Sequence, residues 1–450
     1  MYKAIGNMNQ INNLKIKNFQ KSFSQSRRIK SFLFLFISIF IGIFPYFSNK
    51  KPSLNSLIII SVFIFLYGIF VLSRNFKRDS IQQDLKTDGF NGEFPSLDII
   101  VAARDEQYVI QRLVERLFNL DYPSEKLNIF IIDDGSEDET PNILRKLSKK
   151  YQKLQIISRV KNAGGGKSGA LNDALRLTSG EWVFILDADA QLRNDTLIKV
   201  LNHAFRGKWS AVQLRKSVIN GSQNLLTKCQ SIEMVMDAFF QIGRLSSGGV
   251  SELRGNGQLI NKKILIESGS FNEDTVTDDL DLSVRLLLFG SEIGILWDPP
   301  VMEEAVETFP ALFAQRQRWA EGGLQRFFDY GSDLILGKIN ILKKFDIFYF
   351  FILQYALPII SLSDLVSSLL FMRTPIYLPI SMTAFILSAI ASWFGCKRNQ
   401  DMSSIQNSNL VSILIYLLYL SHWFIVIPLV ALKMSIFQKK LLWKKTLHKG

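Results

Sequence analysis

Two pairs of acidic residues each follow a short apolar run, an arrangement typical of ligand sites in α/β proteins. Asp133 and Asp134 end the run at 127–134, ahead of a Gly-Ser turn. Asp187 and Asp189 follow the run at 182–186. Ligands of open α/β sheets bind outside the carboxyl ends of the strands. Carboxylates at that edge can hold a base, a ribose or a hard cation such as Mg²⁺, although either pair could equally belong to an ordinary turn.

A glycine-rich loop with a lysine at its centre, residues 162–172 (NAGGGKSGALN), suggests phosphate chemistry. Glycines let backbone N–H groups approach an anion, and the N-terminus of a following helix adds a favourable dipole. Lys167 would add a positive charge beside the same anion. A P-loop NTPase is disfavoured because its motif requires glycine at position 161, where this chain has lysine. A plain flexible loop is the alternative.

Two further motifs lie downstream of these loops. Thr277, Asp278 and Asp279 open an amphipathic helical pattern, so the threonine could simply be an N-cap. A carboxylate at that helix start, facing a metal site, could instead serve as a general base. Arg318 and Trp319 could bind a pyrophosphate and stack on a sugar. A basic, aromatic face beside a membrane is the alternative explanation for this pair.

The elements that must position these residues read as alternating strands and helices. Short apolar runs at 97–103, 127–133, 154–158 and 182–186 predict strands, and helical patterns at 107–119 and 169–178 lie between them. Such alternation indicates βαβ units and a mostly parallel sheet flanked by helices. We therefore expect an α/β domain at 79–330.

Apolar segments on both sides of this domain are long enough to span a bilayer. We expect a transmembrane hairpin at 31–78, formed by the uncharged runs 31–48 and 54–72. Two to three more spans are expected at 346–432, from 346–372, 376–394 and 410–432. The segment 331–345 is predicted to form an amphipathic helix on the membrane surface. A basic N-terminal segment at 1–30 and a basic tail at 433–450 complete the chain.

The charge distribution supports a membrane protein. The net charge is +13, yet all 40 acidic residues lie in 79–401, so the basic surplus falls on the two ends. Because these bases flank apolar runs, they favour contact with anionic lipid headgroups over nucleic acid. The positive-inside rule predicts an integral, multi-pass membrane protein with its α/β domain in the cytoplasm. With three histidines and two widely separated cysteines, a zinc site is disfavoured and acid–base chemistry falls to carboxylates.

Four motifs resemble, in order and spacing, those of membrane-bound family 2 glycosyltransferases, which have a GT-A fold and use nucleotide sugars. They are Asp133-Asp134-Gly135, Asp187-Ala188-Asp189, Thr277-Asp278-Asp279 and Gln315-x-x-Arg318-Trp319. The resemblance implies that Glu106 and Asp134 contact the uridine, and that Asp279 is the catalytic base. It implies that Asp187 and Asp189 organise the diphosphate and a divalent metal. The remaining expected substrate-binding residues are Asp133, Lys167 and Asp278 around the donor, and Gln315, Arg318 and Trp319 on the acceptor side. Asp278 replaces the family's more usual glutamate, and residues 102–105 depart from the family's usual segment before Glu106.

Three longer stretches, at 163–172, 252–258 (ELRGNGQ) and 318–323 (RWAEGG), resemble the cyanobacterial-type monoglucosyldiacylglycerol synthases. This likeness implies an inverting hexosyltransferase with UDP-glucose as donor, 1,2-diacylglycerol as acceptor, and Mg²⁺, or alternatively Mn²⁺, as cofactor. A processive β-linked polysaccharide synthase shares the four motifs and is the first alternative. Another glycolipid or polyprenyl-phosphate glycosyltransferase is the second. A non-catalytic receptor or scaffold would be favoured by loss of a motif carboxylate, and all of them are present.

Overall fold

The computed structural model describes residues 23–47, 54–83, 93–398 and 409–437. Most of the predicted basic N-terminal segment and of the basic tail therefore lie outside the described residues. Residues 23–30, which the sequence assigned to that segment, form the start of helix α2 (Phe23–Ile43).

The central element is a seven-stranded mixed sheet in the order β3-β2-β1-β4-β6-β5-β7. Neighbouring strands are parallel except that β6 runs antiparallel to both β4 and β5. The predicted mostly parallel sheet is therefore confirmed. The strands are β1 Leu97–Ala103, β2 Leu127–Asp134, β3 Leu154–Arg159, β4 Trp182–Leu186, β5 Ala211–Val218, β6 Gln258–Asn261 and β7 Ile293–Glu303.

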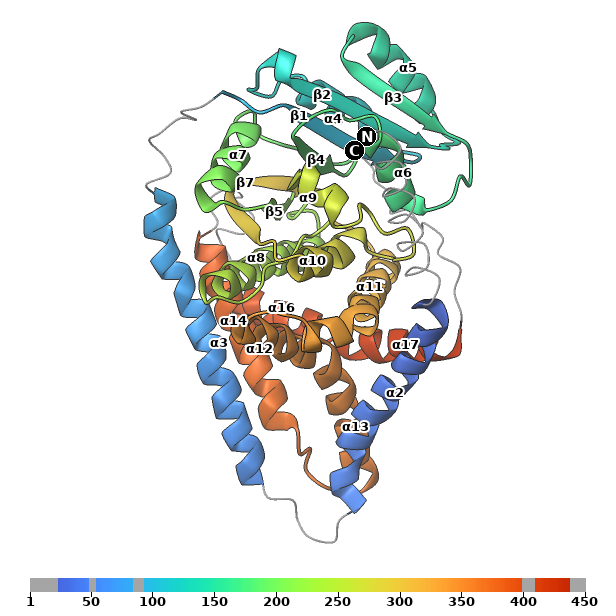
Figure 1. Ribbon diagram of the computed structural model, residues 1–450. Coiled ribbons are helices and arrows are strands. Elements are labelled where there is room, and N and C mark those ends of the chain that lie inside the picture. Colours follow the sequence, from blue (N-terminus) through green and yellow to red (C-terminus); the bar gives the residue numbers. More distant parts are fainter. Residues whose placement is uncertain (1–22, 48–53, 84–92, 399–408, 438–450) are drawn as a thin grey trace.

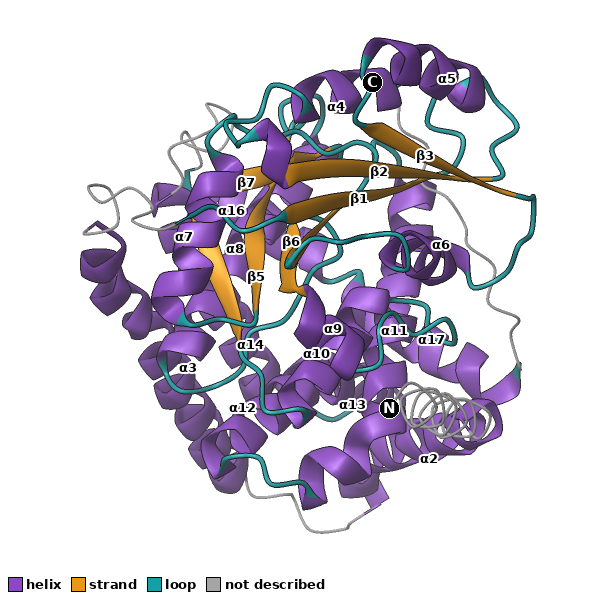
Figure 2. Ribbon diagram, turned by 45° about the horizontal axis from the view of Figure 1, so that its top comes forward, coloured by secondary structure: helices purple, strands orange, loops and turns teal. Residues whose placement is uncertain are grey.

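Helices cover both faces of the sheet (Figure 2), which explains why the inner strands are continuous apolar runs rather than alternating ones. Every residue of β1 is buried. One face packs against α4 (Ile110–Leu117), α5 (Thr140–Lys150) and α7 (Thr196–Gly207). The other packs against α6 (Gly166–Leu175), α9 (Lys262–Glu267) and α10 (Asp278–Leu288).

The strand register brings the acidic loops to one edge of the sheet. β1 lies between β2 and β4, with Ala103 opposite Asp133 and Val101 opposite Leu186. The chain that follows β2 and the chain that follows β4 therefore leave the sheet side by side. The N-terminus of α6 reaches the same edge from β3.

Long helices extend from the α/β domain on the side of α8 (Leu225–Ser246) and α11 (Phe309–Leu336), as Figure 1 shows. They are α2, α3 (Leu54–Gln83), α12 (Ile341–Phe351), α13 (Leu357–Leu370), α14 (Leu378–Arg398), α16 (Leu410–Leu420) and α17 (Trp423–Ile436). Three short elements complete the set: the 3-10 helices η1 (Phe44–Phe47) and η3 (Ser124–Lys126), and the π-helical turn η4 (Ile352–Ala356). In Figure 1, α2, α3, α13 and α14 point away from the sheet, whereas α17 runs across beneath α11.

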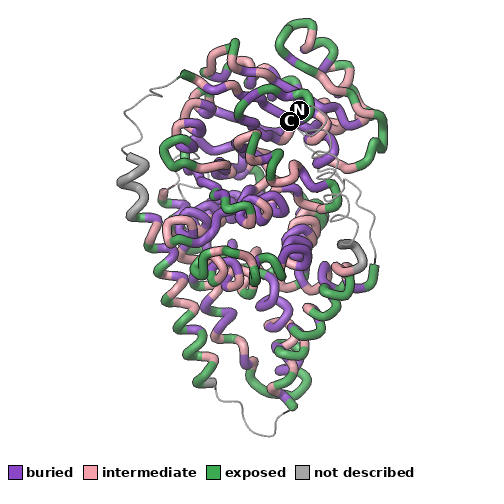
Figure 3. Tube along the Cα trace, in the orientation of Figure 1, coloured by how far each residue is buried: buried purple, intermediate pink, exposed green. Residues whose placement is uncertain are grey.

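Five helical stretches in the described residues are long and apolar enough to cross a membrane. They are Ser26–Phe47, Asn55–Phe76, Ile341–Leu370, Leu378–Arg398 and Leu410–Ile436, close to the five apolar runs expected from the sequence. Large apolar side chains of α2 and α3, such as those of Phe36 and Phe63, are more than half exposed. Figure 3 shows exposed residues along much of both helices. Such a surface matches a hydrocarbon environment better than water.

The segment 331–345 differs from the expected single amphipathic helix. α11 continues to Leu336, and α12 begins only at Ile341 after a break at Gly337. Gly337 ends α11 in an extended conformation, with φ −63° and ψ 160°. Only glycine fits there without a shift, since a β-carbon would lie 2.3 Å from the carbonyl oxygen of Asp333. The two halves of the predicted segment therefore belong to different helices.

Candidate active site

A cavity of about 600 Å³ opens at the carboxyl edge of the sheet and continues between the apolar helices. Its walls come from the loops after β1, β4 and β7, from the N-termini of α6 and α10, and from α8 and α11. Nine of the eleven expected site residues line it: Glu106, Lys167, Asp187, Asp189, Asp278, Asp279, Gln315, Arg318 and Trp319. Motifs that span 214 positions of sequence from Glu106 to Trp319 are thereby brought to one space.

The glycine-rich loop places Lys167 at the start of α6. Gly164, Gly165 and Gly166 have φ angles of +91°, +69° and +53°, in the left-handed region that glycine adopts at little cost. The Lys167 ammonium donates to Asp187 Oδ1 at 2.5 Å and to the Gly255 carbonyl at 3.4 Å. Burial lowers the pKa of Lys167, but the nearby carboxylates of Asp187 and Asp278 more than offset it, so the pKa is raised. The lysine is therefore a fixed positive charge in the cavity.

Asp187 and Asp189 are held by hydrogen bonds to groups just before β6 and just after β7. The backbone N–H of Asp187 donates to Asn256 Oδ1 at 3.1 Å, and the N–H of Glu304 donates to Asp189 Oδ2 at 2.9 Å. No group of three or more His, Cys, Asp or Glu side chains in the described ranges is arranged to hold a metal ion. A site of two carboxylates fits Mg²⁺ completed by substrate phosphates, and the ammonium resting on Asp187 shows that this carboxylate attracts a cation.

Asp278 and Asp279 occupy the first turn of α10, at the wall of the cavity. Burial, followed by the charge of the adjacent Asp278, raises the pKa of Asp279 to about 6. Burial also raises the pKa of Asp278. Thr277 is at the N-cap position but makes no side-chain capping bond. It packs instead against Gly322 of α11, where a β-carbon would lie only 2.0 Å from its hydroxyl oxygen. Simple helix capping therefore does not explain this motif.

Trp319 in the cavity wall packs against Arg316, a residue that the sequence analysis did not predict. Arg316 lies three positions earlier on the same face of α11, with its guanidinium carbon 3.9 Å from the indole centroid. Arg316 is fully buried and pairs with Glu233 of α8. Lys216 of β5 contacts the same ring at 5.8 Å. The sequence QRQRW at 315–319 could have predicted this contact, since Arg316 and Trp319 are three positions apart and share a helical face.

Asp133 and Asp134 are not among the residues that line the cavity. Asp133 Oδ1 accepts from the backbone N–H of Ser136 at 3.0 Å and so holds the turn. Asp134 pairs with Arg159 of β3, which also donates to Asp173 Oδ2 at 2.9 Å. Burial raises the pKa of Asp134, and Arg159 opposes that rise. The structure thus gives the turn two internal partners that the sequence reading did not anticipate.

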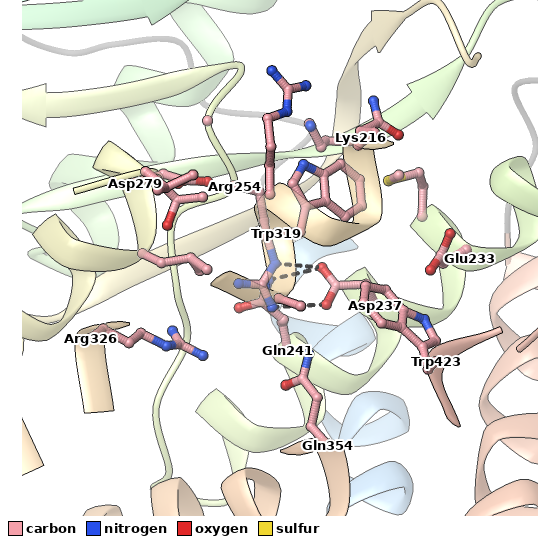
Figure 4. A pocket seen from close by; sticks show the side chains of 18 of the residues that line it. Lys216, Glu233, Asp237, Gln241, Arg254, Asp279, Trp319, Arg326, Gln354 and Trp423 are labelled. Carbon is pink, nitrogen blue, oxygen red and sulfur yellow. Dashed lines mark hydrogen bonds and ion pairs between the residues drawn. The ribbon is translucent and has the colours of Figure 1, made fainter. Parts of the chain in front are cut away.

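Beneath Trp319, an ionic network lines the cavity where its polar end meets its apolar end (Figure 4). Arg254 donates to both carboxylate oxygens of Asp237, at 3.0 and 2.9 Å, and to Glu252 at 2.8 Å. Glu252 also pairs with Arg326 at 3.0 Å. Burial would raise the pKa of Glu252, but Arg326 and Arg254 outweigh it and hold that pKa well below its usual range. Glu252 and Arg254 belong to the run ELRGNGQ at 252–258, which the sequence analysis noted without assigning a role to either residue.

Known proteins match this chain over most of its length. A family model described as glycosyl transferase family 2 matches residues 98–269. β-Monoglucosyldiacylglycerol synthases from Nostoc sp. and Synechocystis sp. are each 40% identical, over 363 and 369 residues. The alignments cover 80% and 81% of this chain, and 78% and 77% of those proteins. A probable glycosyltransferase of Bacillus subtilis is 26% identical over 373 residues.

The fold also has a solved counterpart. A mannosyltransferase from Pyrobaculum calidifontis, determined in complex with GDP-Man and Mn²⁺, matches with a TM-score of 0.56 at 18% identity. The match covers 85% of this chain and 100% of that one, and it confirms the expected GT-A arrangement. Together with the 40% identity to the cyanobacterial enzymes, these findings show that the chain belongs to glycosyltransferase family 2.

Proposed function

We propose that the protein transfers glucose from UDP-glucose to 1,2-diacylglycerol with inversion, giving β-monoglucosyldiacylglycerol. The observation that carries this proposal is the continuity of the cavity. Its polar end holds Asp187, Asp189 and Asp279, and its other end lies among apolar residues of α12, α13, α14 and α17. A site so built accepts a charged donor from water and an apolar acceptor from the bilayer. The names of the relatives from Nostoc and Synechocystis support the same donor and acceptor classes.

The donor is expected to lie across the carboxyl ends of β1, β2 and β4, with its diphosphate near Lys167 and Arg318. A divalent cation, Mg²⁺ in our proposal and Mn²⁺ as the alternative, would bind Asp187 and Asp189 and neutralise charge on the leaving diphosphate. Lys167 supplies a second positive charge at the same place, because its pKa is raised. Burial lowers the pKa of Arg318, and Asp187 counteracts it. Glu106 lines the neighbouring wall, where the uridine would lie.

Asp279 is the proposed general base. The free hydroxyl of the acceptor attacks the anomeric carbon, the bond from that carbon to the diphosphate oxygen breaks, and UDP leaves. Asp279 takes the hydroxyl proton as the new glycosidic bond forms. A pKa near 6 suits this role, since the carboxylate is mostly ionised at neutral pH yet still binds a proton appreciably. Trp319 and Gln315 would flank the acceptor.

The protein is proposed to be an integral membrane protein whose α/β domain faces the cytoplasm. The helix ends nearest this domain carry basic residues, including Arg27 and Arg28 on α2, Arg74 on α3 and Lys397 on α14. The positive-inside rule assigns such ends to the cytoplasmic side. UDP-glucose, a soluble donor, is then on the same side as the site that uses it.

The direct test uses the full chain purified in detergent with Mg²⁺ and radiolabelled UDP-glucose, with and without diacylglycerol. Lipid extracts are separated by thin-layer chromatography. The proposal predicts one labelled glycolipid that appears only when diacylglycerol is present. Label in an insoluble, growing polymer would identify a processive polysaccharide synthase instead. Transfer from another nucleotide sugar, but not from UDP-glucose, would refute the proposed donor.

A further inference from the structure

The apolar half of the cavity contains a polar amide side chain, that of Gln354, among apolar side chains. Gln354 lies in η4, one turn of π-helix between α12 and α13, within the apolar stretch Ile341–Leu370. Around it the cavity is lined by side chains such as Leu353, Leu357 and Phe385. Gln354 is exposed and lines the cavity, and Figure 4 shows its side chain extending there below Gln241.

The side chain of Gln354 makes no hydrogen bond to any residue within the described ranges. Its neighbours do: the Gln241 amide donates to Asp237 at 3.1 Å, and its carbonyl accepts the backbone N–H of Glu252 at 2.7 Å. Ser388, which lines the same half, donates to the Ala384 carbonyl of its own helix at 2.9 Å. The amide of Gln354 is therefore available to a ligand, whereas these other polar groups are already used.

An available amide at this depth requires an explanation. Polar residues that face a cavity inside a membrane protein typically mark substrate paths. Single turns of π-helix also occur frequently at functional sites. Both observations indicate that Gln354 meets a polar group of a molecule that enters from the apolar side.

The turn that carries Gln354 is fixed against the helix that carries the acceptor-side motif. Tyr355 packs on α11 so closely that a β-carbon at Gly323 would lie 1.8 Å from its hydroxyl oxygen. The rings of Phe327 and Phe351 meet with centroids 4.2 Å apart. Since α11 also carries Trp319, the position of Gln354 relative to the polar end of the cavity is set by direct packing.

We propose that Gln354 is a specificity-determining residue that recognises the acyl-ester group of the lipid acceptor. This inference rests on the proposed function. The amide N–H donates to an ester carbonyl, the acyl chains lie among the apolar side chains of η4, α13 and α14, and the free hydroxyl extends toward Asp279. A diacylglycerol carries its hydroxyl one or two carbons from an ester, so one molecule can present both groups.

The test compares two acceptors in identical detergent micelles: a diacylglycerol with ester links and the dialkylglycerol with ether links in their place. The wild-type protein is expected to favour the ester by about tenfold in kcat/KM, the size of one hydrogen bond to a group otherwise left unpaired. Gln354→Leu keeps the size of the side chain but removes the amide. It should remove the preference, so that kcat/KM becomes equal for the ester and the ether, and it should leave the KM for UDP-glucose unchanged.

Ile352→Leu is the matched control, because Ile352 belongs to the same turn, is half exposed and does not line the cavity. It should keep the wild-type ratio of ester to ether. Equal use of ester and ether by the wild-type protein would overturn the inference even if Gln354→Leu failed to fold. So would a folded Gln354→Leu protein that retains the preference for the ester. A wild-type protein that glucosylates neither lipid would instead refute the proposed function itself.

Discussion

Replacing Asp279 with asparagine removes the proposed base while keeping the shape of the side chain. General-base assistance is typically worth about 10²- to 10⁴-fold in rate, so kcat should fall by that factor. The KM for UDP-glucose should change little, because Asp187, Lys167 and Arg318 remain in place. The loss should appear in glycolipid formation at saturating donor and acceptor.

The raised pKa of Asp279 also predicts the pH profile. A carboxylate of pKa about 6 is about 90% ionised at pH 7 and about 10% ionised at pH 5, so kcat/KM, which reports groups of the free enzyme, should fall about tenfold across that interval. The sign follows from the role, since only the ionised form accepts a proton. The negative charge of Asp278 contributes to the raised pKa, so Asp278→Asn should move the acid limb to lower pH.

The assay measures initial rates of labelled glycolipid formation from pH 5 to pH 8 for the wild type, Asp279→Asn and Asp278→Asn. Asp333→Asn, an exposed carboxylate on α11, is the matched control and should leave the profile unchanged. An Asp279→Asn protein within a fewfold of the wild-type rate would refute the base assignment. A wild-type profile flat from pH 5 to pH 7 would refute the link between this rate and the Asp279 carboxylate.

Three further predictions follow from the packing and the charges. Gly322→Ala should push Thr277 away, because a β-carbon would lie 2.0 Å from its hydroxyl oxygen, and should lower kcat; full activity would contradict that close packing. Asp346→Ala leaves buried Arg244 without the carboxylate that accepts its hydrogen bonds at 3.0 and 2.9 Å, and should cost about 3–5 kcal/mol in unfolding free energy, measured by denaturant titration in micelles. Chelation of divalent cations by EDTA should abolish transfer, and added Mg²⁺ or Mn²⁺ should restore it; transfer that persists in EDTA would exclude the proposed metal.

The sheet and the polar half of the site were predictable because local patterns determine them. Strands buried on both faces read as continuous apolar runs, and parallel strands place their terminal loops at one edge. Asp187 and Asp189 were found this way. Lys167 followed from a loop that only glycines can form. These signals are local in sequence, so no knowledge of packing was required.

The partners that fix the site were not predictable, because they depend on contacts between distant segments. The guanidinium of Arg316, which contacts the Trp319 ring, forms an ion pair with Glu233 of another helix. Arg159 forms an ion pair with Asp134 because β2 and β3 pair in the sheet. Gln354 was not predicted, because its place in the cavity depends on the π-helical turn and on the helices around it. The end of α11 at Gly337 was not predicted either, because it depends on the extended conformation of that glycine. Periodicity along one segment carries none of this information.

The proposed reaction is a single inverting displacement at this cavity, with a lipid hydroxyl as the acceptor. Its most direct test is the structure of the product made by the purified protein from UDP-glucose and diacylglycerol, determined by mass spectrometry and proton NMR. We expect one glucose per lipid, joined to the free hydroxyl in the β configuration. An α-linked glucoside, or a chain of several glucose units on one acceptor, would contradict it.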